Sequence, residues 1–164
     1  MTPQPEEVIR LLNDAGVEYV VIGGVAMVAH GSARATFDFD VCYRRSSENI
    51  DRLCRALAPH HPSLRGAPHG LPFRFEPETV KAGLNFTLAT DLGDIDLLGE
   101  VAGLGSYESV AGASDVKVIG DGQCRILSID GLLKTKRAIA RKKDMDGIEE
   151  LEALRDLRKR LGEF

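Results

Sequence analysis

The sequence predicts an α/β protein in which a mixed β-sheet is flanked by helices, with two helices at the C-terminus. In the first half of the chain, short apolar strand patterns alternate with longer segments of helical periodicity. In the second half, two strand pairs, each with a short turn, precede two helical segments. Strands that are separated by helices in one region and joined as hairpins in another indicate a mixed sheet rather than a regular parallel repeat.

Size and charge limit the class of protein. The chain has 164 residues, which fits a single domain, expected here over 1–164 with a core over about 1–127 and a helical segment over about 128–164. The net charge of -4 argues against a general nucleic-acid coat, which would be basic throughout, but it leaves room for a local basic site.

Compartment and redox state are indicated by what the sequence lacks. No apolar run approaches the roughly 18 residues of a membrane span, and the N-terminus has no signal-peptide pattern. The three cysteines are odd in number and have no C-x-x-C spacing, which argues against a disulfide scaffold or a zinc ribbon. We therefore expect a cytoplasmic protein with no membrane partner.

The positions of proline and glycine predict the boundaries of the first helices and strands. A helix is expected after Thr2, where a proline follows a good N-cap residue, and it should end at Gly16. A short buried strand over 19–22 comes next, followed by two glycines and a short helix over 25–30.

The middle of the chain contains a second strand and a long connection. Alternation of apolar and polar residues predicts a strand over 37–43, and Ser46 or Ser47 should cap the helix after it. The segment 59–72 contains four prolines and two glycines, so it is expected to be a loop.

Hairpins and helices complete the prediction. Hairpins are expected over 85–98 and 116–127, followed by one helix from Ser128 to about Ala140 and another that opens at Asp144. One apolar stripe of the last helix is expected to be buried: Ile148, Leu151, Leu154, Leu157 and Leu161.

Carboxylates in the predicted strand over 37–43 carry the main chemical signal. Side chains alternate between faces along a strand, so Asp38 and Asp40 share one face while Phe39 points into the core. Two carboxylates so close together repel each other, and a divalent cation removes that penalty. Hard cations such as Mg²⁺ take oxygen ligands, so the pair is a candidate metal site.

A second acidic strand supplies further carboxylates at Asp94 and Asp96, which again share a face. If this strand pairs beside the first, three carboxylates converge. Such a set holding two Mg²⁺ ions is suited to phosphoryl or nucleotidyl transfer, because the metals stabilise the attacking and leaving oxygens.

The glycine pair Gly23-Gly24 lies between a predicted strand and a short helix. Glycines expose backbone N–H groups without Cβ obstruction, and a helix N-terminus favours phosphate. This turn is therefore a candidate phosphate-binding site.

Together these motifs resemble a known family. The segment Ile22-Gly23-Gly24, thirteen residues, then Asp38-Phe39-Asp40 and a later Asp96, is similar to the signature of the DNA polymerase β-type nucleotidyltransferase superfamily. Two fuller patterns look like the minimal bacterial nucleotidyltransferases of the AbiEii toxin type: Gly31-x-x-Arg34-x-Thr36-x-Asp38-x-Asp40 and Leu132-Leu133-x-x-Lys136-x-x-x-x-Arg141-x-Lys143-Asp144. The resemblance covers nearly the whole chain.

The resemblance implies a mixed sheet of about five strands and an assigned role for each motif. Asp38, Asp40 and Asp96 would be the catalytic metal ligands for two Mg²⁺ ions, or Mn²⁺, and Asp96 is preferred to Asp94, which is expected to be a turn residue. The residues implied to bind the nucleotide are Gly23, Gly24, Lys136, Arg141, Lys143 and Asp144. Arg34 and Thr36 are added from their place beside the acidic strand: the fork of Arg34 suits phosphate, with a surface ion pair as the alternative, and a structural role is the alternative for Thr36.

The implied reaction is the transfer of an NMP from an NTP, such as ATP, to an acceptor hydroxyl. The acceptor expected from the toxin branch is the 3′ end of tRNA, with a cognate antitoxin as a further partner. A small-molecule antibiotic or a protein as acceptor remains an alternative. A non-catalytic nucleotide-binding or interaction module also remains open, although all three carboxylate positions are filled.

Overall fold

The computed structural model describes residues 4–33, 35–36, 38–68, 72–139 and 145–162. The first half of the chain contains α1 (Pro5–Asp14), β1 (Tyr19–Ile22), α2 (Gly23–Ala29), β2 (Phe39–Tyr43), α3 (Ser47–Leu57), the 3₁₀ helix η1 (Ala58–His60), β3 (Ser63–Leu64) and α4 (Pro77–Ala82). The second half contains β4 (Phe86–Thr90), β5 (Gly93–Leu98), β6 (Glu100–Val101), β7 (Gly105–Ser106), α5 (Tyr107–Gly112), β8 (Ser114–Ile119), β9 (Gly122–Leu127), α6 (Ile129–Ile139) and α7 (Met145–Leu161).

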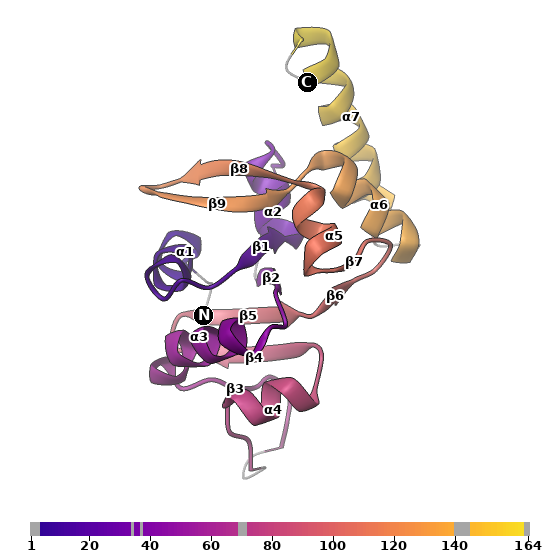
Figure 1. Cartoon of the computed structure of the whole chain (residues 1–164). Coiled ribbons are helices and arrows are strands. Elements are labelled where there is room, and N and C mark those ends of the chain that lie inside the picture. The colour runs from indigo at the N-terminus through magenta and orange to yellow at the C-terminus, as the bar shows by residue number, and fades with distance from the viewer. Residues whose placement is uncertain (1–3, 34, 37, 69–71, 140–144, 163–164) are drawn as a thin grey trace.

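In the described part of the chain, seven strands form one mixed sheet in the order β3-β4-β5-β2-β1-β9-β8 (Figure 1). The centre of the sheet combines both pairing modes, because β2 is antiparallel to β1 and parallel to β5. The strands β6 and β7 form a separate small pair. The prediction of a mixed sheet flanked by helices, with two helices at the C-terminus, is confirmed.

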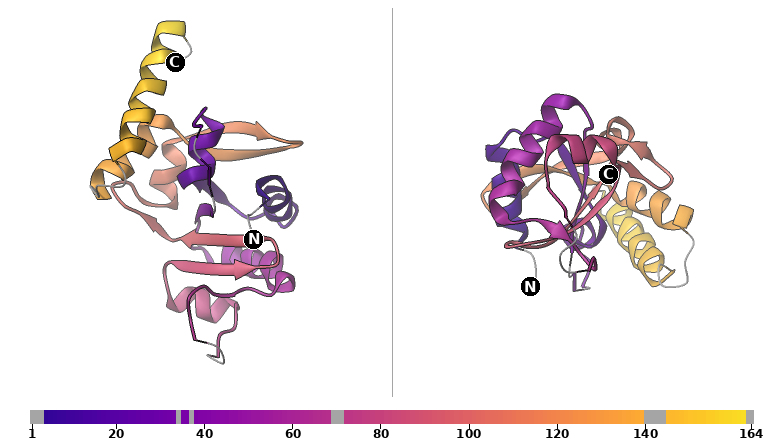
Figure 2. Two further views of the ribbon diagram at one scale, coloured as in Figure 1. Left: turned by 180° about the vertical axis from the view of Figure 1, so that it is seen from behind. Right: turned by 90° about the horizontal axis from the view of Figure 1, so that it is seen from below.

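Helices lie at both ends of the sheet. Figures 1 and 2 show α6 and α7 side by side near the β8–β9 hairpin, whereas α3 and α4 lie near β3 and β4. The central strands bury one apolar face almost completely, since Phe39, Val41, Ile95 and Leu97 are at most 1% exposed. This apolar face fixes which side chains of β2 and β5 point the other way.

Several local predictions are confirmed by the backbone. The β4–β5 and β8–β9 pairs are antiparallel hairpins. Ser46 caps α3, where its hydroxyl oxygen accepts from the amide of Asn49 at 3.3 Å. Ser128 caps α6, and its hydroxyl oxygen accepts from the amide of Gly131 at 3.0 Å. The three cysteines are buried.

Other boundaries differ from the prediction. The helix expected after Thr2 begins at Pro5, with Gln4 as its N-cap. The short helix expected over 25–30 begins at Gly23, so the glycine pair forms its first turn rather than a connection before it. The strand expected from residue 37 begins at Phe39, and residue 37 lies outside the described residues.

The segment 59–72 is more structured than its composition predicts. It contains part of η1 and the two-residue strand β3, which pairs antiparallel with β4 at the edge of the sheet. The strand β3 forms because its backbone pairs with β4, and the local composition of prolines and glycines does not indicate that pairing. The short helices α4 and α5 were also not predicted.

The stripe on α7 is buried only at its beginning. Ile148 and Leu151 are 8% and 0% exposed and Leu154 is partly buried, whereas Leu157 and Leu161 are 50% and 63% exposed. The C-terminal end of α7 extends beyond the rest of the molecule (Figure 1). Among the described residues, no helix combines the length and apolar character that crossing a membrane requires.

Candidate metal and nucleotide site

Three carboxylates predicted from the sequence are brought together at the centre of the sheet. Asp38 directly precedes β2, Asp40 lies in β2, and Asp96 lies in β5. Parallel pairing of β2 with β5 places Asp40 beside Asp96 in register, so both side chains emerge from the same face. One carboxylate oxygen from each of the three residues lies within 4.8 Å of the other two.

The electrostatics of this cluster favour a cation. Burial raises the pKa of Asp40 to about 7, helped by the neighbouring charges of Asp96 and Asp38, while the charge of Arg65 opposes the rise. The Oδ1 atom of Asp40 is buried and makes no hydrogen bond among the described residues. A buried carboxylate oxygen without a donor, within a cluster of oxygen ligands, fits a hard divalent cation such as Mg²⁺ or Mn²⁺.

The glycine pair lies directly against this cluster. Gly23 has φ +65°, and a Cβ there would overlap the carboxylate of Asp40. A Cβ on Gly24 would lie 2.5 Å from Oγ1 of Thr36. The structure therefore gives the glycines a steric reason that the sequence did not reveal: α2 can begin this close to Asp40 only without side chains.

Thr36 connects the glycine pair to the start of β2. Its Oγ1 donates a hydrogen bond to the carbonyl oxygen of Asp38 at 3.1 Å. This side chain packs against Gly24 and holds the backbone before β2, so both contacts serve to stabilise the fold. Its predicted contact with nucleotide stays a prediction.

Arg65 is a member of the site that sequence reasoning missed. Its Nη2 donates to Oδ1 of Asp96 at 2.6 Å, and its Nη1 lies 4.0 Å from Oδ1 of Asp38 and 3.8 Å from Oδ2 of Asp94. Asp94, expected to be a turn residue, instead lies within β5. The only signal that could have found Arg65 was a cation in the long connection between the two acidic strands.

The other predicted nucleotide contacts fall at the C-terminal helices or outside the described residues. Lys136 lies on α6, where its Cε is 3.2 Å from the position that a Cβ on Gly147 of α7 would occupy. The remaining candidates lie outside the described residues: Arg34, Arg141, Lys143 and Asp144.

Charges on α6 and α7 are partly paired with one another. Arg137 of α6 donates to Glu152 of α7 at 2.6 Å, and Arg155 of α7 donates to Asp130 of α6 at 3.4 Å. Part of the basic character that the sequence places in this segment is therefore balanced within the helix pair.

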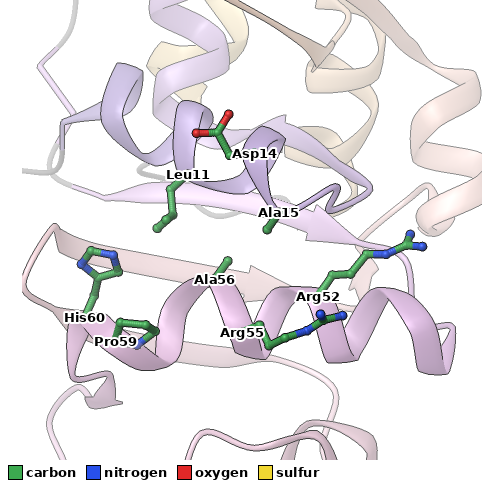
Figure 3. A pocket seen from close by; sticks show the side chains of 8 residues that line it. All are labelled: Leu11, Asp14, Ala15, Arg52, Arg55, Ala56, Pro59 and His60. Atoms are coloured by element: carbon green, nitrogen blue, oxygen red, sulfur yellow. The ribbon is translucent and has the colours of Figure 1, made fainter.

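A separate hollow lies between α1 and α3 (Figure 3). It has a volume of about 440 Å³ and is lined by residues of α1, its C-cap, α3 and η1. Leu11 points into the gap between the two helices, and Ala15 and Ala56 line it from opposite sides. None of its lining residues is among the predicted site residues.

Comparison with solved structures identifies the class of fold. The chain has the mixed α/β fold of a nucleotidyltransferase. One structure with this fold is that of the lincosamide antibiotic adenylyltransferase LnuA with lincomycin bound. The two superpose with a TM-score of 0.61 at 13% sequence identity, over 94% of this chain and 99% of LnuA. The sequence matches no family model and no curated protein sequence.

Proposed function

We propose that this chain is a metal-dependent nucleotidyltransferase that moves an NMP from an NTP to an acceptor hydroxyl. The observation that carries the proposal is the cluster of Asp38, Asp40 and Asp96, which lie just before β2, in β2 and in the adjacent parallel strand β5 of a nucleotidyltransferase fold. In the reaction the acceptor oxygen forms a bond to the α-phosphorus and gives up its proton, while the bond to the bridging oxygen breaks and pyrophosphate leaves.

Each part of the site has a proposed role. Asp38, Asp40 and Asp96 would hold the divalent cations, which supply charge stabilisation for the attacking and leaving oxygens when bound. Gly23 and Gly24 offer backbone N–H groups next to these carboxylates, with no side chain to keep a triphosphate away. Thr36 fixes the backbone of Asp38 through its hydrogen bond, so the first ligand is held before substrate arrives.

Two acceptors are supported by different observations. The superposition covers nearly all of both chains, so the adenylyltransferase with the bound antibiotic needs no further domain beyond what this chain has. That favours a small-molecule hydroxyl. The resemblance to AbiEii-type toxins and the run of six basic residues over 134–143 support the 3′ end of tRNA and a cognate antitoxin.

Labelled substrates separate these acceptors. The chain is incubated with Mg²⁺ and each α-³²P-labelled NTP, together with bacterial RNA, a panel of hydroxyl-bearing antibiotics, or protein alone. Label in a tRNA band supports the toxin branch, and label on an antibiotic supports the small-molecule branch. Absence of label with every acceptor contradicts the proposal and favours a nucleotide-binding module.

The first prediction concerns the carboxylates. Asp38→Ala and Asp96→Ala should each lower NMP transfer by roughly a thousandfold or more, because losing several kcal/mol of transition-state stabilisation corresponds to such a factor. Release of labelled pyrophosphate from γ-³²P-labelled NTP measures the rate. Asp121→Ala, at an exposed carboxylate in the β8–β9 turn, is the matched control and should retain activity. Unchanged transfer in either site variant would rule out the assignment.

A further inference from the structure

Arg65 is attached to the sheet by its backbone, while its side chain reaches across the sheet. The residue follows β3, and its amide donates to the carbonyl oxygen of Thr87 in β4 at 2.9 Å. Its Nη1 also donates to the carbonyl oxygen of Leu88 at 3.2 Å. Its backbone and side-chain bonds to β4 together place the guanidinium beside Asp96.

The guanidinium occupies the position of a counter-ion among the carboxylates. It contacts Asp96 directly and lies within 4.0 Å of oxygens of Asp38 and Asp94. Its side chain is 30% exposed and that of Asp96 is 18% exposed, so the interaction is only partly screened by water. The positive charge of Arg65 thus reduces the electrostatic repulsion among the neighbouring carboxylates.

A divalent cation and this guanidinium compete for the same carboxylate. The Oδ1 of Asp96 accepts the 2.6 Å hydrogen bond from Arg65, and Asp96 is also one of the three residues whose oxygens converge on a cation site. Two cations close together repel, so a guanidinium held against Asp96 opposes the arrival of a divalent cation at the cluster.

We propose that Arg65 is a positioning residue that holds Asp96 in place in the metal-free protein and must release it when the divalent cation binds. This inference rests on the proposed function for the identity of the metal site. It makes Arg65 a determinant of metal affinity: removing its charge should tighten metal binding, although it also removes a hydrogen bond from the site.

The test measures metal binding without turnover. Binding of Mn²⁺ alone, with no nucleotide, is followed by electron paramagnetic resonance for the wild-type chain, Arg65→Met and Arg65→Gln. Hydrogen bonds to charged groups are worth enough to change an equilibrium by roughly tenfold or more, so both variants should bind Mn²⁺ about that much more tightly. Arg65→Gln retains an amide donor for the carbonyl of Leu88 and covers the case in which Arg65→Met does not fold.

Arg10→Met is the matched control, since Arg10 pairs with an exposed carboxylate of Asp121 at 3.2 Å and should leave Mn²⁺ affinity unchanged. A second readout is thermal unfolding in EDTA and in Mn²⁺. In EDTA, the Arg65 variants should unfold at a lower temperature than the wild type. Adding Mn²⁺ should raise their unfolding temperature by more than it raises that of the wild type.

The outcomes separate this inference from the proposed function. Equal or weaker Mn²⁺ affinity in the Arg65 variants overturns the inference and leaves NMP transfer to be judged by the labelling assay. Tighter Mn²⁺ binding without NMP transfer to any acceptor upholds the inference and contradicts the proposed function. Failure of every variant to bind Mn²⁺ overturns both the inference and the metal site.

Discussion

Gly24 leaves no room for a side chain at the point where α2 begins. An added Cβ would lie 2.5 Å from Oγ1 and 2.9 Å from Cβ of Thr36, which is closer than real Cβ atoms pack. Thr36 cannot simply move aside, because its hydroxyl holds the backbone of Asp38. The steric fit of these residues therefore couples the start of the helix to the first carboxylate.

We expect Gly24→Ala to destabilise the protein by about 1–3 kcal/mol, the usual range for overpacking, and to lower NMP transfer as well. Urea unfolding and the labelling assay measure the two effects. The control is Gly112→Ala in α5, where a Cβ would have open space and should be neutral or slightly stabilising. Equal stability of Gly24→Ala and Gly112→Ala would show that the close approach is not constraining.

Among the single residues of the site, the carboxylates could be predicted from the sequence, whereas Arg65 could not. Asp38 and Asp40 are two residues apart on a strand, so alternation alone predicts a shared face. Arg65 reaches Asp96 only because β3 pairs with β4 and β4 pairs with β5. No local pattern contains those pairings, so the contact could not be read from the residues around Arg65.

For a whole element, α7 shows the same difference between what a local sequence pattern predicts and what contacts with the rest of the fold decide. Helical periodicity predicted both the helix and the stripe that faces inward. It could not predict where the partner surface ends, so Leu157 and Leu161 are exposed although they continue the stripe. Periodicity describes one helix, whereas burial depends on the length of the surface against which it packs.

Two leucines of α7 test this distinction. Leu151 is fully buried and Leu157 is 50% exposed. Leu151→Ala should lower the free energy of unfolding by about 2–5 kcal/mol, the range for large-to-small core substitutions. Leu157→Ala should change it by at most about 0.5 kcal/mol, as is usual for surface substitutions. Chemical denaturation compares the two variants, and similar losses of unfolding free energy would contradict this packing of α7.

For the whole molecule, the raised pKa of Asp40 links stability to pH. Burial raises this pKa from 3.8 to about 7, so between these values the folded chain holds a proton that the unfolded chain has released. The stabilisation is complete below about pH 4 and is lost as the pH rises through about 7.

In EDTA, the free energy of unfolding should therefore fall between about pH 4 and pH 7, by at most about 4 kcal/mol from this one group. Asp40→Asn removes the titrating group and should flatten that part of the profile. Denaturant unfolding of both chains across this range is the measurement. Parallel profiles for the wild type and the variant would show that Asp40 is not the group responsible.

The overall architecture was predictable because it depends on repeated local signals. Six of the seven strands of the main sheet have alternating or apolar patterns, and the sheet was expected to be mixed. The strand that was missed, β3, has two residues and exists through pairing with β4. The resemblance implied about five strands, and the described sheet extends beyond that number at its edges.

The parallel pairing of β2 with β5 also orders events during folding. Asp40 and Asp96 are far apart in the sequence, and they become neighbours only after the intervening chain has closed into a loop. In a chain where that closure is incomplete, the three carboxylates are not assembled. Bound metal would therefore act on the finished sheet: it would slow unfolding by stabilising the native state, and it would contribute little to the rate at which the sheet forms.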